Sequence, residues 1–266
     1  MREALHDEWI RIWAFALRNL LMASRNIFFL FELTFWPTVG VLSIGLMTRF
    51  LRLSPADASF VLIGTMALST VQVCQLDVSY AVLYDVWSKS MKHQFLAPIA
   101  VRHLTVGSWL VGIVRGLVVF ALLAALAWWA FGFDPLAPGV AALALFLLGC
   151  FLTAWIVGIL VCALVMLFGT RAEASAWATV NLVLVLAGIY YPVSVLPAPA
   201  AGIAAAIPLT YFLDSYRSHF GFAPEFAAPL ARGLGLSALY IALAHLALRA
   251  AIDRTRRTGL LLKMSE

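Results

Sequence analysis

The stretch GIYYPVSVLPAPAAGIAAAIPLTYFLDSYR, from Gly188 to Arg217, decides which folds this sequence can adopt. It is apolar enough to lie within a membrane, yet four prolines interrupt it: Pro192, Pro197, Pro199 and Pro208. Each proline removes a backbone hydrogen-bond donor and clashes with the preceding helical turn, which costs about 3 kcal/mol in a helix interior. A regular membrane-spanning helix therefore cannot continue through this stretch.

The composition of the whole chain is that of an integral membrane protein. Hydrophobic residues make up 64% of the 266 residues and charged residues 12%, whereas soluble domains have roughly 45–50% and about 25%. The formal net charge of +5 requires no nucleic-acid partner, because basic residues beside anionic lipid headgroups account for it. The three cysteines lie in apolar segments without metal-ligand spacing, so we expect no metal site.

Six segments are long and apolar enough to cross the hydrocarbon core as helices, which takes about 20 residues. They cover residues 27–48, 59–82, 105–130, 138–168, 175–191 and 229–250. The chain has no linker or low-complexity segment, so we expect a single transmembrane domain over residues 1–266. Most Lys and Arg residues lie before the first segment, in alternate loops and after the last segment, which predicts that both termini are cytoplasmic.

Residues 1–26 are predicted to form an amphipathic helix in the plane of the lipid headgroups. At about 100° per residue, the basic residues Arg11, Arg18 and Arg25 fall on one line. The opposite face is apolar and consists of Leu5, Trp9, Ile12, Trp13, Ala16 and Leu20. Such a helix places its tryptophans at the apolar boundary and its arginines toward lipid phosphate. The alternative is a plain extension of the first spanning helix.

Residues 190–226 are predicted to form a re-entrant external region before the last span. Irregular backbone at membrane depth is tolerated only where protein or a water-filled cavity covers it. We therefore expect the fifth span to break near Pro192, a short helix around Ala200–Ile207, and a second helix that Pro208 opens. On that second helix Tyr211, Asp214 and Arg217 share one face, where Asp214 and Arg217 can pair. This region is a candidate lid or gate.

Residues 83–104 form a long cytoplasmic loop that mixes charged and large apolar side chains. Its helical periodicity aligns Trp87, Met91 and Phe95 as a stripe at i, i+4 and i+8. Charged residues flank the stripe, and Pro98 ends it. An amphipathic helix with aromatic anchors is what the groove of a partner protein accepts. A helix that rests on the lipid surface is the alternative interpretation.

The external region resembles the signature of type-2 ABC export permeases, the membrane subunits of ATP-binding-cassette exporters. The residues that carry the resemblance are Gly188, Tyr190, Tyr191, Pro192, Leu196, Pro197, Pro208, Leu209, Thr210, Tyr211, Asp214 and Arg217. Ile207 stands where the family usually has Asn. The resemblance extends over nearly the whole chain, since the interfacial helix, six spans, long first cytoplasmic loop and external hairpin follow the same order.

The resemblance implies a permease of the bacterial plasma membrane that exports an amphipathic substrate such as a lipid, a lipid-linked glycan or a hydrophobic drug. It implies two copies of a partner ATPase that binds ATP and Mg, and a second permease subunit, either an identical copy or a homologue. The chain has no G-x-x-x-x-G-K-[ST] phosphate-binding loop, so the permease itself is not predicted to be an enzyme or to bind a cofactor. The implied coupling helix in the first loop includes Asp85, Trp87, Lys89, Met91, Lys92, Phe95 and Pro98.

Three ionisable residues, Glu32, Asp77 and Arg115, lie well inside the predicted spans. Such residues are costly in a membrane and are candidates for function. We expect Arg115 to pair with one or both acids, either to hold helices together or to couple loop movement to the pathway. A membrane-embedded transferase and a secondary transporter or channel remain alternative functions, and dependence on ATP separates them from a permease.

Overall fold

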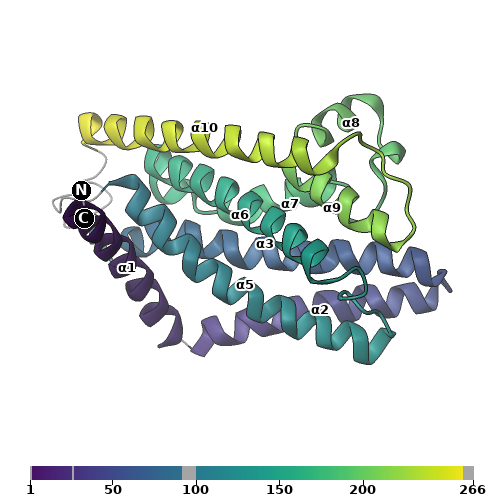
Figure 1. Ribbon diagram of the computed structural model, residues 1–266. Coiled ribbons are helices and arrows are strands. Elements are labelled where there is room, and N and C mark those ends of the chain that lie inside the picture. The colour runs from purple at the N-terminus through teal and green to yellow at the C-terminus, as the bar shows by residue number, and fades with distance from the viewer. Residues whose placement is uncertain (1, 26, 92–99, 260–266) are drawn as a thin grey trace.

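The computed structural model describes residues 2–25, 27–91 and 100–259. Over these residues the chain is all-helical, as the sequence predicts (Figure 1). The α-helices are α1 (Arg2–Ser24), α2 (Ile27–Phe50), α3 (Pro55–Trp87), α5 (Val101–Phe131), α6 (Val140–Phe168), α7 (Ser175–Leu186), α8 (Ala198–Ala204), α9 (Pro208–Arg217) and α10 (Pro229–Thr258). Short 3-10 turns occupy Gly169–Ala172, Val193–Val195 and Ser218–Phe220.

Four helices in the described ranges are long and apolar enough to cross a membrane: α3, α5, α6 and α10. They correspond to four of the six predicted spans. The first predicted span coincides with α2, a helix of 24 residues that contains Pro37. The fifth is shorter than predicted, because α7 has 12 residues and extends about 18 Å, whereas the hydrocarbon core is about 30 Å thick.

Helix α3 is the centre of the bundle. In its apolar part 72% of the residues are buried, against 28% in α10, and it packs most extensively against α5 and α6. Local sequence fixes where α3 begins, since the Ser54 side chain accepts a hydrogen bond from the backbone N–H of Asp57 at 3.1 Å and Pro55 occupies the first helical position. Helix α3 also contacts α1, α2, α7 and α9, so elements at both of its ends pack against it.

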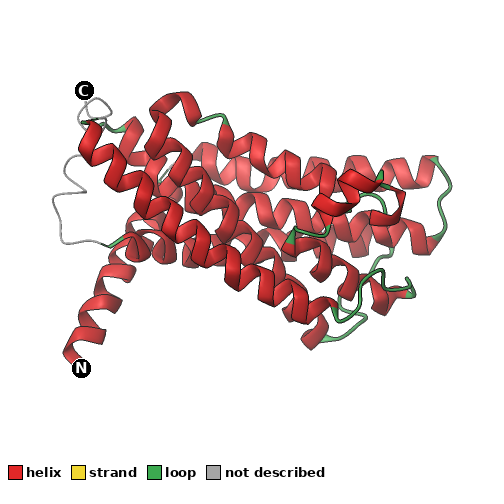
Figure 2. Cartoon of the chain, turned by 90° about the horizontal axis from the view of Figure 1, so that it is seen from above, coloured by secondary structure: helices red, strands yellow, loops and turns green. Residues whose placement is uncertain are grey.

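The bundle has two distinct ends (Figures 1 and 2). At one end, here called the α1 end, α1 lies across the bundle beside the last turns of α3 and the first turns of α5. At the other, here called the hairpin end, α8 and α9 form a helical hairpin between α7 and α10. The two short helices predicted after Tyr191 are therefore present, with the second beginning at Pro208 as expected.

Candidate functional site

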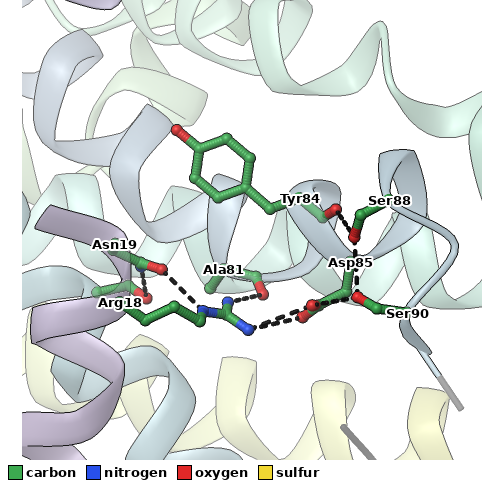
Figure 3. A network of polar contacts seen from close by, with 8 residues as sticks. Arg18, Asn19, Ala81, Tyr84, Asp85, Ser88 and Ser90 are labelled. Carbon is green, nitrogen blue, oxygen red and sulfur yellow. Dashed lines mark hydrogen bonds and ion pairs between the residues drawn. The ribbon is translucent and has the colours of Figure 1, made fainter. Parts of the chain in front are cut away.

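A network of polar contacts joins α1 to the end of α3 (Figure 3). One guanidinium nitrogen of Arg18 donates to both carboxylate oxygens of Asp85, at 3.2 Å each. Another donates to the backbone carbonyl of Ala81 at 3.2 Å. Asp85 is buried and also accepts a hydrogen bond of 2.8 Å from the hydroxyl of Ser90. Arg18 thus fixes the point where the chain leaves α3 and enters the loop.

This position of Arg18 corrects one prediction from the sequence. The arginine line of α1 was expected to face lipid phosphate, but Arg18 faces Asp85 of the same chain. Next to it, the buried side chain of Asn19 donates to the hydroxyl of Ser108 in α5 at 2.6 Å. The buried face of α1 accordingly includes Asn19, together with Phe15, Ala16 and Ala23. Trp9 and Trp13 are exposed, and Arg11 is half-buried.

A second contact joins α1 to the start of α5. The carboxylate of Glu8 accepts two hydrogen bonds from Arg102, at 2.7 and 2.8 Å, and lies 2.7 Å from Nε2 of His103. Nδ1 of His103 accepts from the backbone N–H of Ala100 at 3.1 Å, so Nε2 carries the proton that it donates to Glu8. The hydrogen bonds from Arg102 and His103 lower the pKa of Glu8 from its usual 4.5 to about 2.

The two contacts lie at opposite ends of the same loop. Asp85 is near the last residue of α3, and Arg102 and His103 are at the first turn of α5. Helix α1 can approach α5 closely because residue 107 is glycine: a Cβ there would lie 2.6 Å from the carbonyl oxygen of Ile12. The segment that connects α3 to α5 is therefore attached to α1 where it begins and where it ends.

The predicted aromatic stripe of this loop does not run along one helix. Helix α3 ends at Trp87, and Lys89 adopts the left-handed conformation with φ of 57°, which interrupts helical periodicity. Trp87 is 46% exposed, whereas Met91 is fully buried, so the two do not form a common docking surface. Trp87 instead continues an aromatic row with Tyr80 and Tyr84. Three more predicted loop residues, Lys92, Phe95 and Pro98, lie outside the described residues.

Within the bundle Arg115 of α5 forms an ion pair with Asp77 of α3. Both side chains are largely buried, at 13% and 4% exposure, so each charge depends on the other for compensation. This is the pair expected for one of the two acids. The other acid, Glu32, belongs to α2, and its side chain lies outside the described residues. A small cavity of about 40 Å³ adjoins Arg115 between α2, α3 and α7.

At the hairpin end Arg217 of α9 is 4% exposed and donates three hydrogen bonds to backbone carbonyls. They run to Gly188 at 2.6 Å, Ile189 at 2.6 Å and Phe60 at 3.0 Å. The guanidinium carbon also lies 3.4 Å from the centre of the Phe60 ring, a cation–π geometry. Arg217 consequently joins the end of α7 to the start of α3.

The predicted pair between Asp214 and Arg217 does not form. The carboxylate of Asp214 instead accepts the backbone N–H groups of Glu225 and Phe226, at 3.0 and 3.2 Å. A helical spacing of three residues allows an ion pair. However, the backbone carbonyls that follow α7 have no helical donor, and the buried Arg217 side chain donates hydrogen bonds to them instead. The break itself is at Gly188, which has φ of 69° and so ends α7 in the left-handed conformation that glycine favours.

The remaining residues of the predicted gate support the hairpin in other ways. The Tyr211 hydroxyl donates to the carbonyl of Ala205 at 2.6 Å and closes the turn between α8 and α9. Tyr190 is half-buried against the core, and the Tyr191 hydroxyl donates to the carbonyl of Val185. The prolines act on backbone geometry: Pro192 and Pro197 precede the 3-10 turn and α8, and Pro208 opens α9.

Sequence reasoning missed Glu8, Asn19, Arg102, His103 and Ser108. These residues form hydrogen bonds with partners 89 to 95 positions away in sequence. Contacts over such separations produce no periodic pattern in the sequence from which they could be predicted. It also missed Gly64 of α3, where a Cβ would lie 1.9 Å from the carbonyl oxygen of Ile189. That glycine allows the chain after α7 to pack against α3, at the place where Arg217 binds the carbonyls of Gly188 and Ile189.

Four long apolar helices, a helix across one end and a broken helix at the other define a multi-pass helical membrane protein. The family model of the ABC-2 type transporter matches residues 10–220, which include the contacts of Arg18 with Asp85, of Arg115 with Asp77, and of Arg217 with the end of α7. The chain belongs to this family, as the ABC-2 membrane permease domain, which lacks nucleotide-binding motifs and works with ABC ATPase subunits. The chain is also similar to an uncharacterized protein of Archaeoglobus fulgidus, at 43% identity over 42 residues, 16% of this chain and 66% of the length of that protein.

Proposed function

We propose that this chain is the permease subunit of an ABC exporter that moves an amphipathic substrate across the plasma membrane of a bacterium. The substrate class includes lipids, lipid-linked glycans or polysaccharides, and hydrophobic drugs. Two copies of a separate ATPase subunit bind ATP and Mg, and two permease chains, identical in the simplest assembly, form the pathway. Residues 1–266 act as one transmembrane domain.

The observation that carries this proposal is the attachment of α1 to both ends of residues 83–104. An ATPase that pushes on this loop moves α3 and α5 only if the loop is held rigidly against these helices. The contacts of Arg18 with Asp85, and of Glu8 with Arg102 and His103, tie α1, α3 and α5 together at that point. Exposed Trp87 is the side chain in the described part of this loop that we expect to meet the ATPase.

The proposed topology places the α1 end in the cytoplasm, with α2 as the first membrane segment and α7 with the hairpin as an incomplete fifth segment. Exposed tryptophans on α1, Trp9 and Trp13, support a position in the lipid headgroups. Residues 190–226 then form a re-entrant cover over the pathway at the external side. Arg217 ties this cover to α3 and α7, so that rotation of α3 moves it.

The test is co-purification of the tagged chain with an ABC ATPase subunit in nanodiscs, followed by an ATPase assay. We expect the ATPase to bind the wild-type chain and to bind Trp87→Ala at least about fivefold more weakly. Trp129→Ala removes an exposed tryptophan at the hairpin end and serves as the matched control. Failure of any ATPase to bind, with no nucleotide dependence of the purified chain, would refute the proposal.

A further inference from the structure

A cavity of about 630 Å³ lies at the hairpin end, between the turn that joins α2 to α3 and the loop that joins α5 to α6. It is separate from the contacts of α1 and from those of Arg217. Its size falls in the range of cavities that hold small molecules, roughly 300–1,000 Å³. What it could hold follows from the charges that line it.

Two arginines, Arg49 and Arg52, and one acid, Asp134, line the cavity. Asp134 already accepts the backbone N–H of Leu136 at 2.8 Å. Arg49 donates to the carbonyl of Ala130, which uses one of its five N–H donors. Arg52 forms no ion pair within the described parts of the chain. The lining therefore offers two guanidinium groups to an anion.

Arg52 occupies a backbone position that normally favours glycine. Its φ is 53°, its N–H donates to the carbonyl of Arg49 at 3.1 Å, and the next N–H, of Leu53, donates to that of Thr48 at 3.0 Å. This pair of hydrogen bonds is the Schellman motif, in which the left-handed residue is usually glycine. An arginine there is strained, and it places a cation at the cavity.

Large exposed aromatic residues occur close in sequence to the residues that line the cavity. Phe50, Trp128 and Trp129 are 84%, 65% and 79% exposed. Phe50 follows Arg49 in sequence, and the two tryptophans precede Ala130, whose carbonyl Arg49 binds. Aromatic side chains concentrate where a membrane meets water. Exposed aromatic side chains and Arg49 therefore occur in the last turns of α2 and α5, with the other arginine of the cavity just after α2. The N-terminus of α3, whose first residues also line the cavity, adds partial positive charge.

We propose that this cavity binds a phosphate group, carried by an anionic lipid of the adjacent leaflet. Guanidinium groups match phosphate oxygens in pairs of parallel hydrogen bonds, and the exposed rings accept the acyl chains. This binding site is independent of the export proposal, because it requires only that the hairpin end lies at a membrane surface.

The test measures the thermal unfolding midpoint of the purified full chain in detergent, titrated with short-chain phosphatidylglycerol and, separately, with inorganic phosphate. A ligand that binds the folded state raises the midpoint. The cavity variants are Arg49→Gln and Arg52→Gly, and the control is Arg232→Gln, an exposed arginine at the same end outside the cavity. Arg52→Gly relieves the positive φ, so we expect it to fold at least as stably as the wild-type chain without ligand.

We expect phosphatidylglycerol to raise the midpoint of the wild-type chain and of Arg232→Gln, and to bind both cavity variants at least about tenfold more weakly. If inorganic phosphate binds as tightly as the lipid, with the same dependence on the two arginines, the phosphate site stands and the lipid assignment falls. If neither ligand shifts the midpoint, or if Arg52→Gly and Arg49→Gln bind like the wild-type chain, the proposal is overturned.

Discussion

Arg18 of α1 and Asp85 of α3 are 67 residues apart in sequence and are joined by two hydrogen bonds of 3.2 Å. Asp85 has a side-chain exposure of 7% and Arg18 of 29%, so the carboxylate relies on this arginine and on Ser90 for its compensation. Removal of one partner of such a pair leaves the other charge poorly solvated. The contact therefore fixes α1 against the end of α3, whereas Asn19 and Glu8 hold α1 against α5.

Arg18→Gln is expected to loosen α1 from α3 without unfolding the bundle. The substitution removes the guanidinium group from a buried carboxylate, and we expect a local loss of about 1–3 kcal/mol. Hydrogen exchange of residues 2–25 in nanodiscs should speed up by at least about fivefold relative to the wild-type chain. Arg11→Gln, on the same line of α1, should leave the exchange rate unchanged. Equal exchange in the two variants would contradict a holding role for Arg18.

The contact of Glu8 with Arg102 and His103 should weaken in acid. Because its pKa in the folded chain is lowered from 4.5 to about 2, the ionised carboxylate stabilises the contact fully above about pH 4.5. This contribution is lost progressively as the pH falls toward about 2. Protection of the α1 amides, which is the intrinsic exchange rate at each pH divided by the observed rate, should therefore fall over this range in the wild-type chain and change less in Glu8→Gln. A Glu8→Gln variant with the same acid dependence would show that other groups control it.

Gly64→Ala should displace the broken end of α7 from α3. The added Cβ would lie 1.9 Å from the carbonyl oxygen of Ile189 and 2.9 Å from the Arg217 guanidinium, and backbone atoms cannot move aside as a flexible side chain can. We expect a loss of about 1–3 kcal/mol in stability, seen as a lower unfolding midpoint. Gly202→Ala in α8 has open space around its Cβ and should be neutral or slightly stabilising.

Arg217→Lys keeps the positive charge but should still loosen the hairpin. An ammonium group lacks the planar fork with which Arg217 reaches the carbonyls of Gly188, Ile189 and Phe60. At least one buried carbonyl loses its donor, at a cost of about 1–3 kcal/mol. Proteolysis within residues 190–226 should be faster in Arg217→Lys than in Arg232→Lys. The same cleavage rate in both variants would show that Arg217 does not hold the hairpin.

Arg115→Ala should destabilise the bundle by about 3 kcal/mol or more, because it leaves Asp77 buried without its partner. Combining Arg115→Met with Asp77→Asn removes both charges and should restore most of the lost stability. The ATPase rate of the assembled complex separates the two roles considered for this pair. A restored fold with a normal rate indicates a structural role, and a restored fold with an uncoupled rate indicates a role in coupling.

The helices were predictable because their signal is local. Apolar length identified α3, α5, α6 and α10, and Pro208 marked the start of α9. The break predicted near Pro192 comes earlier, because α7 ends at Leu186 and Gly188 adopts the left-handed conformation. Contacts across long stretches of sequence carry no such signal. Thus Arg18 was placed toward lipid from its helical period, although it meets Asp85, and Arg217 was paired with Asp214 from their spacing, although the carbonyls exposed at the end of α7 bind it.

The segment between α3 and α5 shows the same limit within one stretch of sequence. A period of four residues linked Trp87 to Met91, but the left-handed backbone of Lys89 places them in different environments. The positive φ of Lys89 separates the two side chains, and this torsion cannot be predicted from the hydrophobic pattern of the sequence. Exposed Trp87 is therefore not part of a continuous stripe with Met91, and the docking role proposed for this segment rests on Trp87 alone of these two residues.

The most direct test of the account measures how tightly an ABC ATPase subunit binds the chain in nanodiscs, for the wild-type chain, Arg18→Gln, Asp85→Asn and the double variant. If α1 and the loop act as one body, each single variant weakens binding by at least about fivefold and the double variant is no worse than either, because all three remove the same contact. Binding that is unchanged in all three variants, or losses that simply add, would contradict the claim that α1 holds the loop in position for the ATPase.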